Sequence, residues 1–192
     1  MILLKKYDYI VFYDNFLNDQ EIALIQEHVA NKTSEQGEIF TDNDDQVVVP
    51  KVRNSLVKWI EPVKEVEWLS KKIYELIFDA NNNFFHMELS ECSNLQHTTY
   101  EAPSGHYRAH IDAFFNTSLP RKISFTIQLS DEKQYDGGDL LIFHSDFDKP
   151  KKAPRKKGSV TVFFSMFIHQ VTPVTRGTRH SLVGWVSGPP LK

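Results

Sequence analysis

The texture of the sequence changes near residue 84. Beyond this point, short runs rich in Val, Ile, Phe and Tyr recur at a spacing of roughly 10–15 residues, with glycine at several turns. One run, "ISFTIQLS" at residues 123–130, alternates apolar and polar residues, and neighbours in a strand point to opposite faces. The two faces are Ile123, Phe125, Ile127 and Leu129 on one side, and Ser124, Thr126 and Gln128 on the other. The pattern predicts a mostly β protein (α+β overall) built as an antiparallel double-sheet barrel. The partly polar inner face indicates that the barrel holds a bound group in its interior.

Two helices are predicted in the first 90 residues. Residues 18–32 begin with a capping-box pattern, Asn18 followed three residues later by Glu21, and residues 63–83 carry a second helical stripe that stops at a run of asparagines. The apolar positions are Ile22, Leu24, Ile25 and Val29 in the first helix, and Val66, Leu69, Ile73, Leu76 and Ile77 in the second. These helices should pack outside the barrel.

Two other N-terminal segments are not helical in character. Residues 1–17 have a short apolar patch but no cleavage site, so a strand is expected rather than a signal peptide. Residues 35–56 are polar, acidic and rich in turn formers, which indicates a surface excursion or a lid.

Length and composition favour one ordinary globular domain. The 192 residues suit a single domain in which residues 1–90 provide helical support and a lid, and residues 91–190 the barrel core. The net charge of −3 gives no reason to expect a nucleic-acid partner. No apolar run is long enough to span a membrane, and the single cysteine, Cys92, excludes an internal disulfide. A cytoplasmic location is therefore expected.

A candidate metal site begins in "HYRAHIDAFFN", residues 106–116. His110 and Asp112 are two residues apart, so on a strand they share one face and could grip a divalent metal. Of the histidines that follow, His169 lies just after a β-like run, in a late strand expected to face the earlier one across the barrel. His144 is the rival third ligand, but no arginine follows it at a useful distance. Two histidines and a carboxylate with open positions opposite form the facial triad of non-haem Fe(II) oxygenases.

Ten residues after His169, an arginine completes the pattern. If the intervening "TRGT" forms a hairpin-like return, Arg179 lies on the neighbouring strand and points into the same cavity. Arg176, within that turn, is the alternative but is expected to face solvent. Ser181 shares a face with Arg179, and a guanidinium with a hydroxyl suits a small carboxylate.

Three segments together resemble a known family. "YEAPSGHYRAHIDAFF", "YDGGDLLIF" and "GSVTVFFSMFIHQVTPVTRGTRHSLVGW" look like the core of the Fe(II)/2-oxoglutarate-dependent dioxygenases, closest to the prolyl 4-hydroxylase-like group. The resemblance covers roughly residues 95–187. It implies a double-stranded β-helix, that is, a jelly-roll or cupin-like barrel.

The resemblance also implies roles for particular residues. His110, Asp112 and His169 would bind iron, and Arg179 would bind the C5 carboxylate of 2-oxoglutarate. The further co-substrate contacts are expected at Tyr100, Ser181 and Gln128. The implied cofactors are Fe(II), 2-oxoglutarate as co-substrate and O₂, with ascorbate as an additional candidate.

Three functions remain open at this point. The first is hydroxylation of an unactivated C–H bond, foremost in a peptidyl proline, with 2-oxoglutarate decarboxylated to succinate; the partner is then a peptide or protein. The second applies the same mechanism to a free amino acid, another small molecule or a nucleobase. The third is a cupin-like barrel that binds metal without turnover, which has no need for Arg179.

Purely structural roles are the alternatives for each residue. His110 with Asp112 could be a hydrogen-bonded strand pair, His169 a core histidine and Tyr100 a packing residue, while Tyr107 and Trp185 are expected to line the core or pocket. Gly137 and Gly138 indicate a turn or bulge. The basic segment 149–158 is expected to be a solvated connection, with a docking strip for an acidic partner as the alternative.

Overall fold

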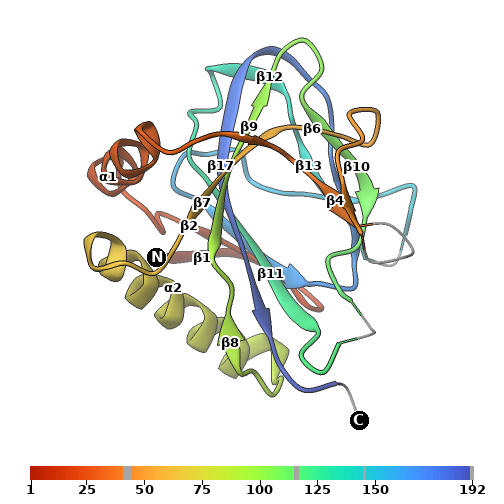
Figure 1. Ribbon diagram of the computed structural model, residues 1–192. Coiled ribbons are helices and arrows are strands. Elements are labelled where there is room, and N and C mark those ends of the chain that lie inside the picture. Colours follow the sequence, from red (N-terminus) through yellow and green to blue (C-terminus); the bar gives the residue numbers. More distant parts are fainter. Residues whose placement is uncertain (41–44, 115–116, 145, 191–192) are drawn as a thin grey trace.

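The computed structural model describes residues 1–40, 45–114, 117–144 and 146–190, and its strands form two large antiparallel sheets (Figure 1). The ten-stranded sheet has the spatial order β1 (Ile2–Tyr7), β2 (Ile10–Asp14), β15 (Val160–Phe164), β11 (Arg121–Gln128), β17 (Val174–Ser187), β9 (Leu95–Glu101), β7 (Leu56–Ile60) and β3 (Glu35–Gln36), and β8 (Glu91–Cys92) and β12 (Tyr135–Gly137) also pair with β17. The five-stranded sheet has the order β14 (Lys151–Lys152), β13 (Leu140–Phe143), β16 (Ile168–Val171), β10 (His106–His110) and β6 (Arg53–Asn54). A separate hairpin pairs β4 (Ile39–Phe40) with β5 (Gln46–Val47).

The chain passes back and forth between the two large sheets. In chain order, β9, β11, β15 and β17 belong to the ten-stranded sheet, whereas β10, β13 and β16, which lie between them, belong to the five-stranded sheet. This alternation winds the chain as a double-stranded β-helix, so the predicted jelly-roll architecture is confirmed.

The two faces of β11 separate the hydrophobic core from the barrel interior. Its four predicted apolar residues are buried in one core cluster with the apolar side of the second helix. On the opposite face, Ser124 contacts the candidate metal site and Thr126 lines the main cavity. The predicted alternation along this strand is confirmed, and it explains why the interior of the barrel is polar.

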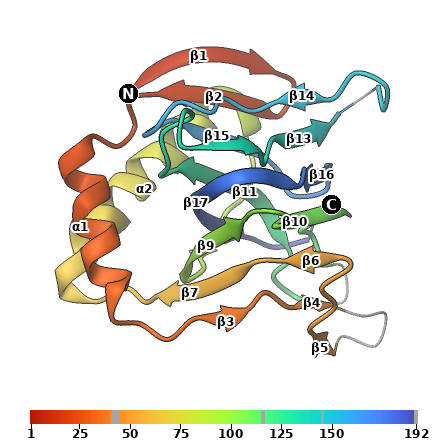
Figure 2. The same cartoon turned by 90° about the horizontal axis from the view of Figure 1, so that it is seen from above.

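Both helices cover the same side of the strands, as Figure 2 shows from above. Helix α1 (Asp19–Ala30) begins with the expected capping box between Asn18 and Glu21. Its buried residues are Ile22, Ile25 and Val29. Leu24, which the sequence groups with these apolar positions, is 52 % exposed and lies outside the buried stripe. At about 100° per residue, position 24 is turned roughly 200° from position 22 and points away from the core.

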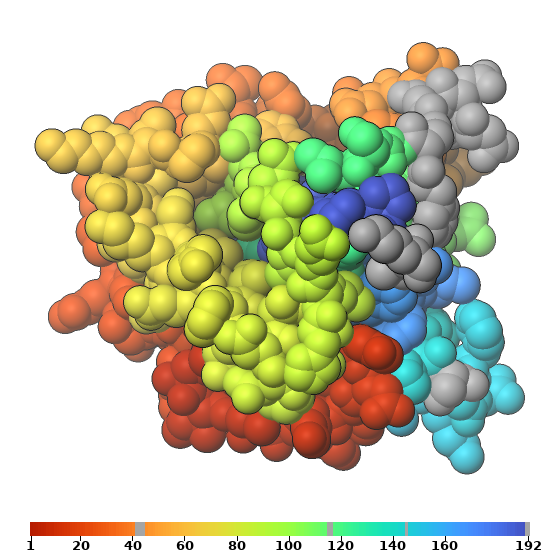
Figure 3. All heavy atoms as spheres, turned by 90° about the horizontal axis from the view of Figure 1, so that it is seen from below, coloured from red at the N-terminus to blue at the C-terminus, as the bar shows by residue number. Residues whose placement is uncertain are grey.

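Helix α2 (Glu67–Ala80) buries all five of its predicted apolar residues, although Val66 lies just before it in a short 3₁₀ turn (η1, Lys64–Val66). The helix continues into a π-helical turn (η2, Asn81–Phe85), which ends at the left-handed backbone of His86. Figure 3 shows α2 (yellow) beside the segment that follows it (yellow-green). The first strand after α2 is β8, which begins at Glu91. The predicted start of the β-rich region, near residue 84, was therefore too early.

The glycine pair and the described part of the polar N-terminal segment both lie where the sequence places them, at a bulge and at the surface. Gly137 and Gly138 have positive φ angles at a register shift between β12 and β17, and a Cβ on Gly137 would lie 2.0 Å from the Pro173 carbonyl oxygen. The predicted excursion forms β3 to β6 on the pocket side, although residues 41–44 of it lie outside the described part of the chain. Across the described residues, no helix has the length and apolarity needed to cross a membrane.

The basic segment 149–158 is engaged in ion pairs at the molecular surface. Lys152 and Arg155 both bind Asp139, and Lys156 binds Asp14 at 2.6 Å. These contacts favour the expected structural connection over a free docking strip.

Candidate metal centre and co-substrate pocket

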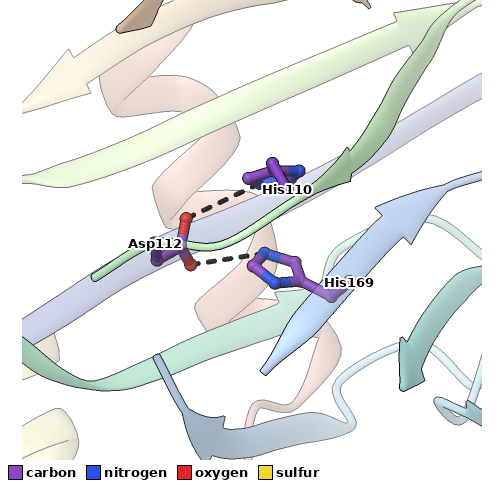
Figure 4. A group of neighbouring side chains, drawn as sticks. All are labelled: His110, Asp112 and His169. Atoms are coloured by element: carbon purple, nitrogen blue, oxygen red, sulfur yellow. Dashed lines mark ion pairs between the residues drawn. The ribbon is translucent and has the colours of Figure 1, made fainter. Parts of the chain in front are cut away.

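His110, Asp112 and His169 converge as the sequence predicts. One ligand atom from each lies within 4.8 Å of the others, and Figure 4 shows the two imidazoles directed at the carboxylate. His110 ends β10, Asp112 follows two residues later, and His169 is on β16. The expected approach across the barrel was wrong, because His110 and His169 are direct partners on neighbouring antiparallel strands. A strand pair fixes such neighbours more rigidly than opposed walls of a barrel would.

Backbone carbonyls orient both imidazoles. The Nδ1 atom of His110 donates to the Arg108 carbonyl oxygen at 2.8 Å, and that of His169 donates to the Phe167 carbonyl oxygen at 3.0 Å. These bonds place the proton of the neutral ring on Nδ1 and leave the Nε2 lone pair for a metal. The two Nε2 atoms lie 3.6 Å and 3.3 Å from the Asp112 carboxylate oxygens.

Electrostatics favours the protonation states that a metal needs at Asp112 and His110, whereas His169 favours a proton when no metal is bound. Burial raises the pKa of Asp112, but the adjacent His169 and His110 outweigh it and hold that pKa well below its usual range. Burial and the neighbouring His169 lower the pKa of His110. Burial lowers the pKa of His169, but Asp112 outweighs it and raises that pKa, so a divalent cation would take the place of this proton.

Two buried serines support the carboxylate. The hydroxyl of Ser124 donates to Asp112 Oδ2 at 2.7 Å and lies 2.8 Å from the hydroxyl of Ser165. The backbone N–H of Asp112 also donates to the Ser165 carbonyl oxygen at 3.0 Å. Sequence reasoning placed Ser124 on the polar face of its strand but did not identify its partner, because contacts between distant strands leave no local pattern.

The three candidate ligands open onto a cavity of about 440 Å³ that also contains Arg179 and Ser181. Arg179 is only 3 % exposed, and neither its Nη1 atom nor Ser181 Oγ has a hydrogen-bond partner among the described residues. Buried polar groups in native proteins are nearly always paired, so these two point to an acidic ligand. The predicted place of Arg179 on a strand beside His169 was wrong, since β17 belongs to the opposite sheet.

The rival residues lie elsewhere. Arg176 is exposed and binds Asp136 at 2.6 Å, as expected for the surface turn. His144 packs edge-on against Phe167 and is not part of the metal-ligand cluster.

A family model describes this part of the chain. Residues 95–187 match the model of the 2OG-Fe(II) oxygenase superfamily. Just under half of the chain is thus similar to that superfamily. The matched segment contains the three candidate iron ligands and Arg179.

Curated proteins similar to this chain are named PKHD-type hydroxylases. One from Maricaulis maris is 41 % identical over 80 residues, which span 42 % of this chain and 36 % of the relative. Another from Crocosphaera subtropica is 28 % identical over 188 residues, covering 92 % of this chain and 78 % of the relative. The chain thus aligns with only about a third of the length of the Maricaulis maris relative.

Solved structures of similar fold include two prolyl hydroxylases. A Pseudomonas putida prolyl-4-hydroxylase has a TM-score of 0.75 and 20 % identity, with 95 % of this chain and 94 % of that chain covered. A Trichoplax adhaerens prolyl hydroxylase in complex with a hypoxia inducible factor peptide fragment has a TM-score of 0.75 and 18 % identity, with coverages of 93 % and 83 %. At these identities the likeness confirms the fold.

The residues present fit the Fe(II) and 2-oxoglutarate that the superfamily implies. Two neutral imidazoles and one carboxylate provide three ligands, and the unpartnered Arg179 and Ser181 lie in the same cavity. When bound, Fe(II) and 2-oxoglutarate would supply the electrons that activate O₂, the oxidant of the C–H bond.

Two residues expected to contact the co-substrate differ in their surroundings. Tyr100 is buried directly across the β9–β17 pair from Arg179, and its ring lies 5.5 Å from the guanidinium carbon. Gln128 donates to the Tyr135 hydroxyl at 2.8 Å and lines a small adjoining cavity with Arg179. Among the residues that the structure describes, Gln128 is not part of the wall of the main cavity.

Two pocket arginines were missed by the sequence reading. Arg53 and Arg121 both line the main cavity, together with the expected wall residues Tyr107 and Trp185. A register shift between Arg121 and Ile123 interrupts the alternation of β11, so strict alternation places Arg121 on the wrong face. The one available signal was a charged residue at the start of a strongly alternating strand.

Proposed function

We propose that this chain is a 2-oxoglutarate- and Fe(II)-dependent hydroxylase that oxidises an unactivated C–H bond, foremost in a peptidyl proline. The observation that carries the proposal is the presence of Arg179, with an unpartnered buried Nη1, in the same cavity as three convergent metal ligands. A metal-binding barrel without turnover has no use for such a cation. The names of the PKHD-type relatives support hydroxylation, and the peptide in the Trichoplax complex supports a peptide substrate.

Each residue has a defined role in this proposal. His110, Asp112 and His169 hold the iron on one side and leave the opposite positions for the co-substrate and O₂. Arg179 pairs with the distal carboxylate of 2-oxoglutarate, with Ser181 as a second donor and Tyr100 beside it. Oxidation of 2-oxoglutarate by O₂ would yield succinate and CO₂, with one oxygen atom entering succinate and the other the substrate C–H bond, and the pocket walls would position the substrate carbon.

The test is Fe(II)-dependent formation of succinate from 2-oxoglutarate, with and without a proline-containing peptide. We expect succinate formation to require Fe(II) and to be stimulated by the peptide. The peptide should gain the mass of one oxygen atom. If a free amino acid stimulates succinate formation and the peptide does not, the substrate is a small molecule and not a peptide. Absence of succinate under all these conditions contradicts the proposed reaction.

Arg179→Gln should weaken 2-oxoglutarate binding by about tenfold to a hundredfold, because a carboxylate would lose its charged partner in a buried site. Calorimetric titration of the Mn(II)-loaded protein measures this effect without turnover. Arg176→Gln removes the same charge from the surface and should leave the affinity unchanged. Equal 2-oxoglutarate affinity in the Arg179→Gln and native proteins would show that this residue does not bind the co-substrate.

A further inference from the structure

Two arginines of the main cavity have no part in the proposed reaction. Arg53 comes from β6 of the five-stranded sheet and Arg121 from the start of β11 in the ten-stranded sheet. Both line the cavity that contains the metal ligands. Positive charge therefore lies on two walls of the pocket, contributed by opposite sheets.

Arg53 is held close to the metal centre. It is 7 % exposed, and it donates from Nε to Ser55 Oγ and from Nη1 to the Glu38 carbonyl oxygen, both at 2.9 Å. Its guanidinium carbon lies 4.7 Å from the ring centre of Tyr107, whose ring stacks on His110 at 3.5 Å. One aromatic ring thus separates this cation from an iron ligand, and both of its hydrogen-bond acceptors are uncharged.

Arg121 is positioned by stacking, and no side-chain hydrogen bond of it is found among the described residues. Its guanidinium carbon lies 4.0 Å from the ring centre of Trp185 and 4.9 Å from that of Phe114. Among the described residues, it makes no ion pair. The indole N–H of Trp185 is buried and also lacks an acceptor within that part of the chain. Adjacent unpartnered donors of this kind are what a bound carboxylate would satisfy.

Among the described residues, the charges of the pocket leave these two arginines in excess. With Fe(II) and 2-oxoglutarate bound, the metal, Asp112, the co-substrate dianion and Arg179 cancel one another. Glu35 and Glu38 also line the cavity, but both are exposed and neither lies within ion-pair distance of an arginine. A largely desolvated cation is costly without a counter-charge, so an acidic group on the substrate would be strongly preferred.

We propose that the pocket selects an acidic peptide segment, in which an Asp or Glu carboxylate next to the hydroxylated residue binds Arg121 and Arg53, with the Trp185 N–H as a further donor. The inference rests on the proposed hydroxylase function for its reaction, but the charge selection can be measured by binding alone. The planar guanidinium fork of arginine matches a carboxylate, and the aromatic rings beside each one restrict its orientation.

Binding of two matched peptides tests this selection. The probes are acetyl-Ala-Pro-Glu-amide and acetyl-Ala-Pro-Gln-amide, titrated calorimetrically into the protein loaded with Mn(II) and saturated with 2-oxoglutarate. We expect the acidic peptide to bind about tenfold or more tightly than its neutral counterpart. Arg121→Gln and Arg53→Gln should each reduce that preference, and Arg176→Gln, a surface charge change, should retain it.

The outcomes separate the two proposals. Equal binding of the two peptides, binding of neither, or an acidic preference that survives both pocket substitutions overturns the inference. Succinate formation without an acidic preference leaves the hydroxylase proposal standing and removes only the selection. An acidic preference in binding without succinate formation supports the selection and contradicts the proposed reaction. Circular dichroism of each variant verifies that a lost preference does not come from a lost fold.

Discussion

At the scale of single residues, the candidate metal ligands depend on side chains that hold them in place. Asp112 is buried, and its Oδ2 atom accepts a hydrogen bond from Ser124, which itself contacts Ser165. Such contacts fix a ligand in its binding orientation, and their loss commonly reduces metal affinity by about 10- to 100-fold.

Ser124→Ala should therefore weaken Fe(II) or Mn(II) binding by about tenfold while the fold is retained. Anaerobic calorimetric titration measures the affinity, and a thermal unfolding curve measures the fold. Ser34→Ala, at an exposed serine, is the matched control and should bind metal like the native protein. An unchanged metal affinity in the Ser124→Ala variant would mean that Asp112 is held by other contacts.

The sequence alone pointed to the four candidate residues of the site but not to how they meet. Spacing and order identified His110, Asp112, His169 and Arg179, because each lies in a local pattern that its chemistry requires. Strand pairing was not accessible in the same way: His169 turned out to be a direct neighbour of His110, whereas Arg179 approaches from the opposite sheet. Local spacing carries no information about which sheet a strand joins.

At the scale of secondary structure elements, helix ends and strand faces were predictable where a local interaction fixes them. The capping box at Asn18 and the apolar stripe of α2 are both present. Periodicity failed at two places: Leu24 is out of phase with the buried helical stripe, and Arg121, which the sequence analysis did not consider, precedes a bulge that resets the alternation of β11. An interruption of periodicity by a bulge depends on the partner strand, so sequence periodicity cannot reveal it.

Asn18→Ala should lower the free energy of unfolding by about 1 kcal/mol, because the Glu21 N–H of α1 would lose its 2.9 Å acceptor. Urea denaturation at neutral pH measures the change. Asn94→Ala removes an exposed asparagine outside the helices and should have little effect. A loss in the Asn18→Ala variant no larger than in this control would show that the cap does not stabilise α1.

At the scale of the whole molecule, the jelly roll places one face of each central strand toward the pocket and the other toward the helices. On β9, Gln96 and Tyr100 line the cavity, and His97 is buried on the opposite face, near His180 and Lys58. Burial, with the neighbouring positive groups, lowers the pKa of His97 from its ordinary value of 6.5 to about 4. The outer face of the sheet therefore links folding stability to pH.

The direction of this effect follows from proton binding. Between pH 6.5 and about 4 the unfolded chain holds a proton at residue 97 that the folded chain does not, so stability from this group is present above pH 6.5 and lost toward pH 4. Lowering the pH from about 7.5 to about 5 should reduce the free energy of unfolding by about 2 kcal/mol through His97 alone.

His97→Gln should accordingly flatten the decline of unfolding free energy over that pH range, as measured by urea denaturation at several pH values. His86→Asn is the control, because His86 is exposed and asparagine tolerates its left-handed backbone. The control should keep the native pH dependence. Identical pH slopes in the native and His97→Gln proteins would argue that His97 titrates normally in the fold.

The central claim is that three side chains from two neighbouring strand ends hold one catalytic metal ion. Anaerobic calorimetric titration with Fe(II), in the native protein and in the Asp112→Ala and His169→Ala variants, tests it most directly. We expect a single ion to bind per native chain, and this binding to be lost in both variants with the fold intact. Fe(II) binding of native affinity in either variant would contradict it.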